Sequence, residues 1–105
     1  MSENQKKRTA LITGASAGIG REMALVFAAE GFDLVLVARR EERLAALAQE
    51  VQGKYGTHSH IVVADLADPA APRRLFDEMA ARHIMVDALV NNAGYTVPGH
   101  FRDTA

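Results

Sequence analysis

The sequence contains no cysteine, no hydrophobic run long enough for a membrane and no excess of charge of either sign. The absence of cysteine excludes disulfide bonds and thiolate chemistry. It is also consistent with the reducing cytoplasm, where we expect the protein to act. A bilayer-spanning helix needs roughly 20 consecutive apolar residues, and no run approaches that length. The formal net charge is -1, so we expect neither nucleic acid nor an anionic membrane as a partner.

What is present is the composition of a globular protein, with 49% hydrophobic and 24% charged residues in a chain of 105. That length suits one small domain. A basic stretch at residues 6–8 precedes an apolar run at residues 10–12, as in a signal peptide. The run is too short for one, because Thr13 follows directly. We therefore expect a polar tail over residues 1–7 and a single domain over residues 8–105.

Short strands and helices are expected to alternate along the chain. Residues 33–38, DLVLVA, are almost continuously apolar, which is typical of a strand covered on both faces in a parallel sheet. Apolar residues recur at helical spacing from Ile19 to Phe27. Asp68-Pro69 is expected to begin a helix, with the carboxylate as its cap and the proline in its first turn. The expected strands are residues 8–13, 33–38, 60–64 and 86–90, and the expected helices are 19–30, 41–52 and 68–83.

This alternation predicts an α/β fold, in which parallel strands form a sheet with helices on both faces. We expect a Rossmann-type, doubly wound parallel sheet of about four strands in the order 3-2-1-4. The order reverses at the first strand, which creates a crevice at the carboxyl ends of the first and fourth strands. Ligands bind in such crevices of open sheets, so functional residues are expected there.

Three glycines follow the first expected strand within seven positions, in the stretch GASAGIG. Gly14 would allow a tight turn out of the strand, Gly18 would leave room for a ligand, and Gly20 would let the helix pack closely on the sheet. The free N–H groups at the start of the helix favour an anion such as a pyrophosphate, to which Ser16 could add a hydroxyl donor. Tight turns also use glycine, and no lysine follows to make a triphosphate P-loop.

The spacing G-x-x-x-G-x-G, in a strand–turn–helix context, resembles the cofactor motif of the short-chain dehydrogenases/reductases. NNAG at residues 91–94 is similar to a second signature of that family, and Asp65-Leu66 resembles its adenine-contacting site. The resemblance covers residues 8–101. It implies hydride transfer between a nicotinamide and a small-molecule carbonyl or alcohol, by an intact enzyme that forms a homo-oligomer.

The resemblance also implies which residues contact the cofactor. Asp65 would accept a hydrogen bond from the adenine amino group, although it could instead cap a turn. Asn91 would border the ribose, although its amide could instead tie the fourth strand to its neighbours. The implied cofactor-binding residues are Gly14, Ser16, Gly18, Ile19 and Gly20 near the pyrophosphate, Arg39 and Arg40 beside the ribose, Asp65 and Leu66 at the adenine, and Asn91, Ala93 and Gly94 along the crevice.

The end of the second strand predicts which nicotinamide cofactor is bound. A carboxylate there bonds the ribose 2′-hydroxyl of NAD, whereas an arginine accommodates the 2′-phosphate of NADP. Arg39 and Arg40 stand at this place, and guanidinium groups match a phosphate with paired, charge-assisted hydrogen bonds. We therefore expect NADP to be preferred over NAD. Many NADP enzymes of the family carry a second basic residue where this chain has Ala17. Arg39 and Arg40 could alternatively pair with the glutamates that follow them.

The proton-transfer machinery of the family is not found in the sequence. The family uses a tyrosine and a lysine in the pattern Y-x-x-x-K, with a serine that holds the substrate oxygen. Tyr55 is followed four residues later by Ser59, and Tyr95 by Gly99. We expect the sequence to be the cofactor-binding portion of a longer reductase and to be inactive alone. The alternative is an NADP-binding module or sensor without catalysis, and turnover of NADPH distinguishes the two.

A metal site is not expected. His58 and His60 are two residues apart, so a strand would present both on one face. No third ligand is evident, and surface histidines account for the pair more simply.

Overall fold

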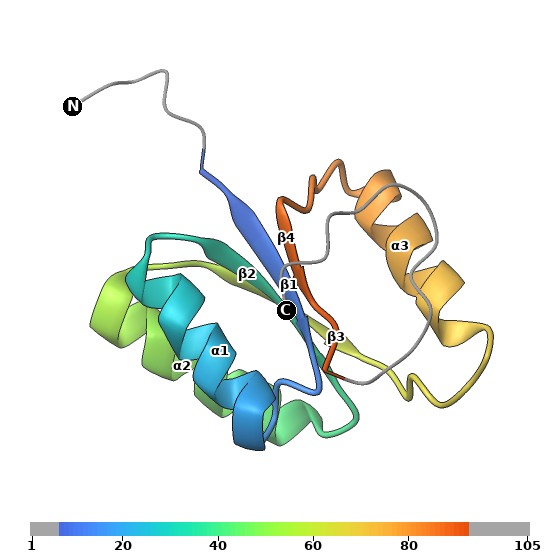
Figure 1. Cartoon of the computed structure of the whole chain (residues 1–105), viewed down its shortest axis with the longest axis horizontal. Coiled ribbons are helices and arrows are strands. Elements are labelled where there is room, and N and C mark those ends of the chain that lie inside the picture. Colours follow the sequence, from blue (N-terminus) through green and yellow to red (C-terminus); the bar gives the residue numbers. More distant parts are fainter. Residues whose placement is uncertain (1–6, 93–105) are drawn as a thin grey trace.

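The computed structural model of the chain describes residues 7–92, which form a parallel sheet with helices on both faces (Figure 1). Lys7 is therefore the only described residue of the expected tail, and its ammonium lies 3.7 Å from the Asp33 carboxylate. Within residues 7–92, no helix is long and apolar enough to cross a bilayer. The elements in order are β1 (Thr9–Thr13), α1 (Gly18–Ala29), β2 (Asp33–Ala38), α2 (Glu41–Tyr55), β3 (Ser59–Val63), α3 (Ala71–Ala81) and β4 (Ala88–Val90).

The sheet has the predicted order, β3-β2-β1-β4, and every pairing is parallel. Leu11 in β1 is aligned with Val35 in β2 and with Leu89 in β4, so β1 lies between β2 and β4. Because all strands run the same way, their carboxyl ends meet at one edge. The connections that follow β1, β2 and β3 therefore gather at that edge.

Alternate residues of each strand enter two different cores. Ile12 and Leu36 pack under α1 and α2, together with Leu44. Their neighbours Leu11 and Val35 pack on the opposite face, under α3. Figure 1 shows α1 and α2 side by side on one face of the sheet and α3 on the other. Coverage on both faces explains why the strand sequence DLVLVA lacks alternating polar residues.

The buried face of α1 differs from the one that its large apolar residues suggested. Gly20, Ala24 and Ala28 are its buried residues, whereas Ile19 is 70% exposed and Val26 is 52% exposed. Small residues four positions apart form one stripe of a helix, and they let its axis approach the sheet closely. Large side chains at these positions would hold the helix away from the sheet.

The ends of α2 and α3 also differ from the sequence prediction. α2 continues beyond Gln52 to Tyr55 and ends at Gly56, whose φ of 70° is left-handed. The prediction that Asp68-Pro69 begins α3 is wrong, because the helix starts at Ala71. The Asp68 carboxylate instead accepts a hydrogen bond from the Ala70 N–H at 3.0 Å, which forms a turn before the helix.

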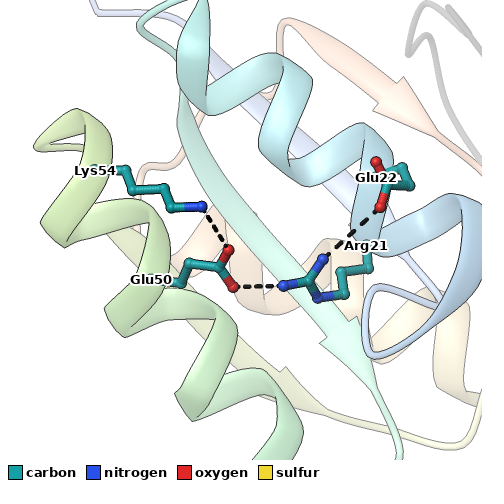
Figure 2. Close-up of polar contacts among 4 residues, drawn as sticks. All are labelled: Arg21, Glu22, Glu50 and Lys54. Atoms are coloured by element: carbon teal, nitrogen blue, oxygen red, sulfur yellow. Dashed lines mark hydrogen bonds and ion pairs between the residues drawn. The ribbon is translucent and has the colours of Figure 1, made fainter.

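A group of charged side chains connects α1 to α2 (Figure 2). The Arg21 guanidinium donates to the Glu50 carboxylate at 2.6 Å, and the Lys54 ammonium donates to the other Glu50 oxygen at 3.1 Å. Glu22 lies farther from Arg21, at 3.8 Å. The hydrogen bond from Lys54 and the nearby Arg21 charge lower the pKa of Glu50 below its ordinary value of 4.5. The ionised form of Glu50 is therefore favoured by folding.

We expect Glu50→Gln to lower the melting temperature slightly at neutral pH. Since folding lowers the pKa of Glu50, its stabilising contribution is present above the ordinary pKa and is lost as the pH falls through the folded value. Thermal unfolding of both proteins should therefore converge in high salt and as the pH falls below the folded pKa of Glu50, which is lower than its ordinary 4.5. Glu22→Gln is the control and should have less effect. A difference that persists in acid would show that packing, and not charge, is responsible.

Candidate functional site

A pocket of about 450 Å³ lies at the carboxyl edge of the sheet. It is formed by the connections that follow β1, β2 and β3, where the sequence predicted Ser16, Arg39 and Asp65. The crevice was expected at the ends of the first and fourth strands, but none of the described residues after β4 lines this pocket. Backbone hydrogen bonds join these connections, from the Ala15 N–H to the Val37 carbonyl at 3.2 Å and from the Ala64 N–H to the Ala38 carbonyl at 3.0 Å. The residues lining the pocket are Gly14, Ser16, Ala17, Ala38, Arg39, Arg40, Arg43, Ala64, Asp65, Leu66 and Ala67.

Each of the three glycines in the turn after β1 and the first turn of α1 has a separate structural environment. Gly14 and Gly18 have φ angles of 63° and 61°, which side chains rarely tolerate. Gly18 faces open space, since a Cβ there would meet nothing within 4 Å. At Gly20 a Cβ would overlap the carbonyl oxygen of Gly14. The turn expected at Gly14 and the close packing expected at Gly20 are thus present in the structure, whereas Gly18 does not line the pocket.

The start of α1 leaves backbone donors available to a ligand. Ala17 is the N-cap residue, with extended backbone at φ -159°, and it makes no capping hydrogen bond through its side chain. The first N–H groups of a helix have no partner within the helix. With the positive end of the helix dipole they favour an anion near Ser16 and Ala17. Ile19, two residues after Ala17, is exposed and does not line the pocket.

Three arginines from the β2–α2 region line the pocket. Arg39 and Arg40 follow β2, Arg43 lies in the first turn of α2, and all three are exposed. Among the described residues, none of the three has a hydrogen-bond or ion-pair partner. The alternative pairing of Arg39 and Arg40 with Glu41 and Glu42 is therefore not found in the structure.

Asp65 and Leu66 line the pocket from the connection after β3. One carboxylate oxygen of Asp65 accepts a hydrogen bond from the Ala67 N–H at 3.0 Å. Asp65 therefore does hold its own turn, which was the alternative to adenine contact. It is also exposed on the pocket side of the sheet edge, so the two roles are compatible.

The residues after β4 lie next to the first glycine. Thr13 donates its hydroxyl to the Val90 carbonyl at 3.3 Å, which ties the end of β1 to the end of β4. A Cβ at Gly14 would lie 2.9 Å from the Asn92 side-chain nitrogen, so Asn92 is the asparagine closest to the glycine turn. Asn91 is partly buried and does not line the pocket. The predictions for Ala93 and Gly94 lie outside the described residues.

Sequence reasoning missed two features of the pocket. Ala17 enters the sequence prediction only as a departure from a family pattern, yet it lines the pocket. Arg43 was not singled out at all. Its place in the first turn of the helix that directly follows β2 was the available signal.

Of the two histidines, His60 lies beside a carboxylate of α3. The His60 imidazole lies 3.2 Å from the Glu78 carboxylate of α3. No group of three or more potential metal ligands occurs in the part of the chain that the structure describes.

An open parallel sheet with a glycine turn at its carboxyl edge defines a Rossmann-like α/β protein. The chain belongs to the short-chain dehydrogenase family, because the family model described as short chain dehydrogenase matches residues 8–105.

Two curated relatives are reductases. The very-long-chain 3-oxoacyl-CoA reductase of Meyerozyma guilliermondii is 38% identical over 104 residues, which cover 95% of this chain and 30% of that protein. Sulfoacetaldehyde reductase 2 of Chromohalobacter salexigens is 44% identical over 84 residues, covering 80% and 32%. The chain thus spans about a third of the length of these relatives.

Solved structures of the same fold include complexes with NADPH. The L-sorbose reductase of Gluconobacter frateurii, complexed with NADPH and L-sorbose, matches with a TM-score of 0.78 and 38% identity, covering 86% of this chain and 34% of that one. A short-chain dehydrogenase of Sphingobium yanoikuyae in complex with NADPH matches with a TM-score of 0.74 and 41% identity, covering 90% and 36%.

Proposed function

We propose that this chain is the NADP-binding portion of an oxidoreductase that transfers hydride between a nicotinamide and a small-molecule carbonyl or alcohol. The observation that carries the proposal is the cluster of Arg39, Arg40 and Arg43 in the pocket beside β2, which have no hydrogen-bond or ion-pair partner within residues 7–92. A carboxylate for the 2′-hydroxyl of NAD is absent from the end of that strand, where Ala38 is followed by Arg39. The NADPH complexes of related structures support the same cofactor.

The pocket fits the adenosine end of such a cofactor in volume and in charge. About 450 Å³ is within the usual range of small-molecule sites. Its lining contains three guanidinium groups and one carboxylate, so it favours an anion. When bound, NADP would supply or accept the hydride. The residues of this chain would bind and orient it.

The proposed contacts follow the edge of the sheet. Ser16 and the backbone from Gly14 to Gly20, including Gly18 and Ile19, would hold the pyrophosphate, while Arg39 and Arg40 would hold the 2′-phosphate. The remaining contacts would come from Asp65 and Leu66 at the adenine and from Asn91, Ala93 and Gly94 at the ribose.

We propose further that residues 8–105 form a dinucleotide-binding domain that does not turn over substrate alone. No tyrosine in the sequence is followed four residues later by a lysine. Proton transfer to or from the substrate oxygen needs a positioned group of suitable pKa. We also propose that the intact enzyme is a cytoplasmic homo-oligomer.

The test is a calorimetric titration of the full 105-residue chain with NADP⁺ and with NAD⁺. We expect NADP⁺ to bind at least about tenfold more tightly, which corresponds to about 1.4 kcal/mol. Adenosine 2′-monophosphate should compete with NADP⁺, because it carries the phosphate that the arginines would recognise. Equal affinity for the two dinucleotides would overturn the proposed preference for NADP.

A further inference from the structure

Arg43 lies outside the glycine, Asp65-Leu66 and NNAG motifs of this sequence. It lies on the third residue of α2, yet it lines the same pocket as Arg39 and Arg40. Its backbone is held by the helix, and its neighbour Leu44 is fully buried in the core beneath α2. The position of Arg43 relative to the sheet edge is therefore set by the packing of α2.

The distribution of unpaired cations over the described residues is uneven. Five cationic side chains have carboxylate partners, and Arg8 lies over the ring of Phe32. Four arginines have no such partner in residues 7–92, namely Arg39, Arg40, Arg43 and Arg73. Three of these four line one pocket, where their mutual repulsion would be relieved by an anion.

The glycine turn supplies no cation to this pocket. Ala17 lines the pocket from this turn and carries no charge, so the position at which a basic side chain was noted for many NADP enzymes contributes none here. A phosphate monoester carries a charge of about -1.5 to -2 and three acceptor oxygens, so a single guanidinium neutralises only part of it. Arg39 and Arg40 both come from the connection after β2, and Arg43 on α2 is placed to add a further cation from a different element.

We infer that Arg43 determines cofactor specificity by holding the 2′-phosphate together with Arg39, as a substitute for the basic side chain that is absent at Ala17. This inference rests on the proposed function, since it concerns the same pocket. It adds a specificity-determining residue from a different element of the fold. The positive end of the α2 dipole, next to Arg43, favours the same anion.

The first experiment compares Arg43→Ala with Arg73→Ala in the full 105-residue chain. Arg73 is the matched control, because it is also exposed and without a partner among the described residues but lies on α3, outside the pocket. We expect Arg43→Ala to weaken NADP⁺ binding by about tenfold or more and NAD⁺ binding by less than about twofold. Arg73→Ala should change neither affinity.

The second experiment restores a cation from the other side of the pocket. Adding Ala17→Arg to Arg43→Ala should recover most of the lost NADP⁺ affinity without strengthening NAD⁺ binding. If Arg43 acted only on the folded structure, an arginine at position 17 would not restore NADP⁺ binding. If the rescue failed, the inference that Arg43 replaces a basic side chain at position 17 would be overturned.

The outcomes separate this inference from the proposed function. If the unmodified chain binds NADP⁺ and NAD⁺ equally, both are overturned. If the unmodified chain prefers NADP⁺ and Arg43→Ala leaves that preference unchanged, only the role of Arg43 is overturned. The same holds if Arg43→Ala weakens the binding of both cofactors equally. A selective loss of NADP⁺ affinity with rescue supports both.

Discussion

Arg39→Asp is expected to lower the affinity for NADP⁺ by about 100-fold or more and to leave NAD⁺ binding equal or stronger. The substitution removes charge-assisted hydrogen bonds worth about 1.5–3 kcal/mol and adds a like charge beside the phosphate. A carboxylate at the end of β2 also suits the 2′-hydroxyl of NAD. Titration of both cofactors by calorimetry measures the change in preference directly.

The control for this change in cofactor preference is Arg73→Asp, which makes the same charge change on α3 away from the pocket. It separates local recognition from the change in net charge. Because Arg39 is exposed and has no partner among the described residues, the folded structure should persist in the variant. Equal losses for NADP⁺ and NAD⁺ would contradict the assignment of Arg39 to the 2′-phosphate.

Gly20→Ala is expected to have the largest effect on folding. The added Cβ would overlap the carbonyl oxygen of Gly14, which is backbone and cannot swing aside as a flexible side chain can. Relief would require α1 to move away from the sheet that it covers. We expect a loss of roughly 3 kcal/mol or more, a large part of the 5–15 kcal/mol that typically stabilises a domain. Urea unfolding followed by circular dichroism measures it.

Gly53→Ala is the matched control for the same chemical change. Gly53 lies within α2, and a Cβ there would meet nothing within 4 Å. Alanine is favoured over glycine in a helix interior by about 1 kcal/mol, so this variant should be more stable than the original chain. If Gly20→Ala unfolded at the original urea concentration, the close approach of Gly20 and Gly14 would be refuted.

The sheet could be predicted from sequence because its evidence is repeated in several strands. An apolar run such as DLVLVA and the regular alternation with helices together restrict the topology to few possibilities. The buried face of α1 could not be predicted in the same way. Hydrophobicity singles out Ile19 and Val26, while close packing selects Gly20 and Ala24, and only the assembled structure shows which criterion applies. The start of α3 was misplaced because an Asp-Pro pair favours a turn as well as a helix.

The pocket was predicted in outline because its residues follow the ends of strands. Any residue directly after β1, β2 or β3 reaches the same edge, so Ser16, Arg39 and Asp65 could be grouped without coordinates. Arg43 and Ala17 could not be related to each other from sequence, because they belong to different helices. Their common pocket depends on how α1 and α2 pack side by side.

The backbone hydrogen bonds that join the three connections have an evolutionary consequence. Ala15 and Ala64 both donate to the last residues of β2, so the frame of the pocket is held by main-chain atoms. Arg39, Arg40 and Arg43 are exposed and make no hydrogen bond or ion pair with the rest of residues 7–92. Mutations at these three positions can therefore change the preferred ligand at little cost to folding. A lineage with this frame could exchange one cofactor for another through a few substitutions, without first acquiring compensating changes in its core.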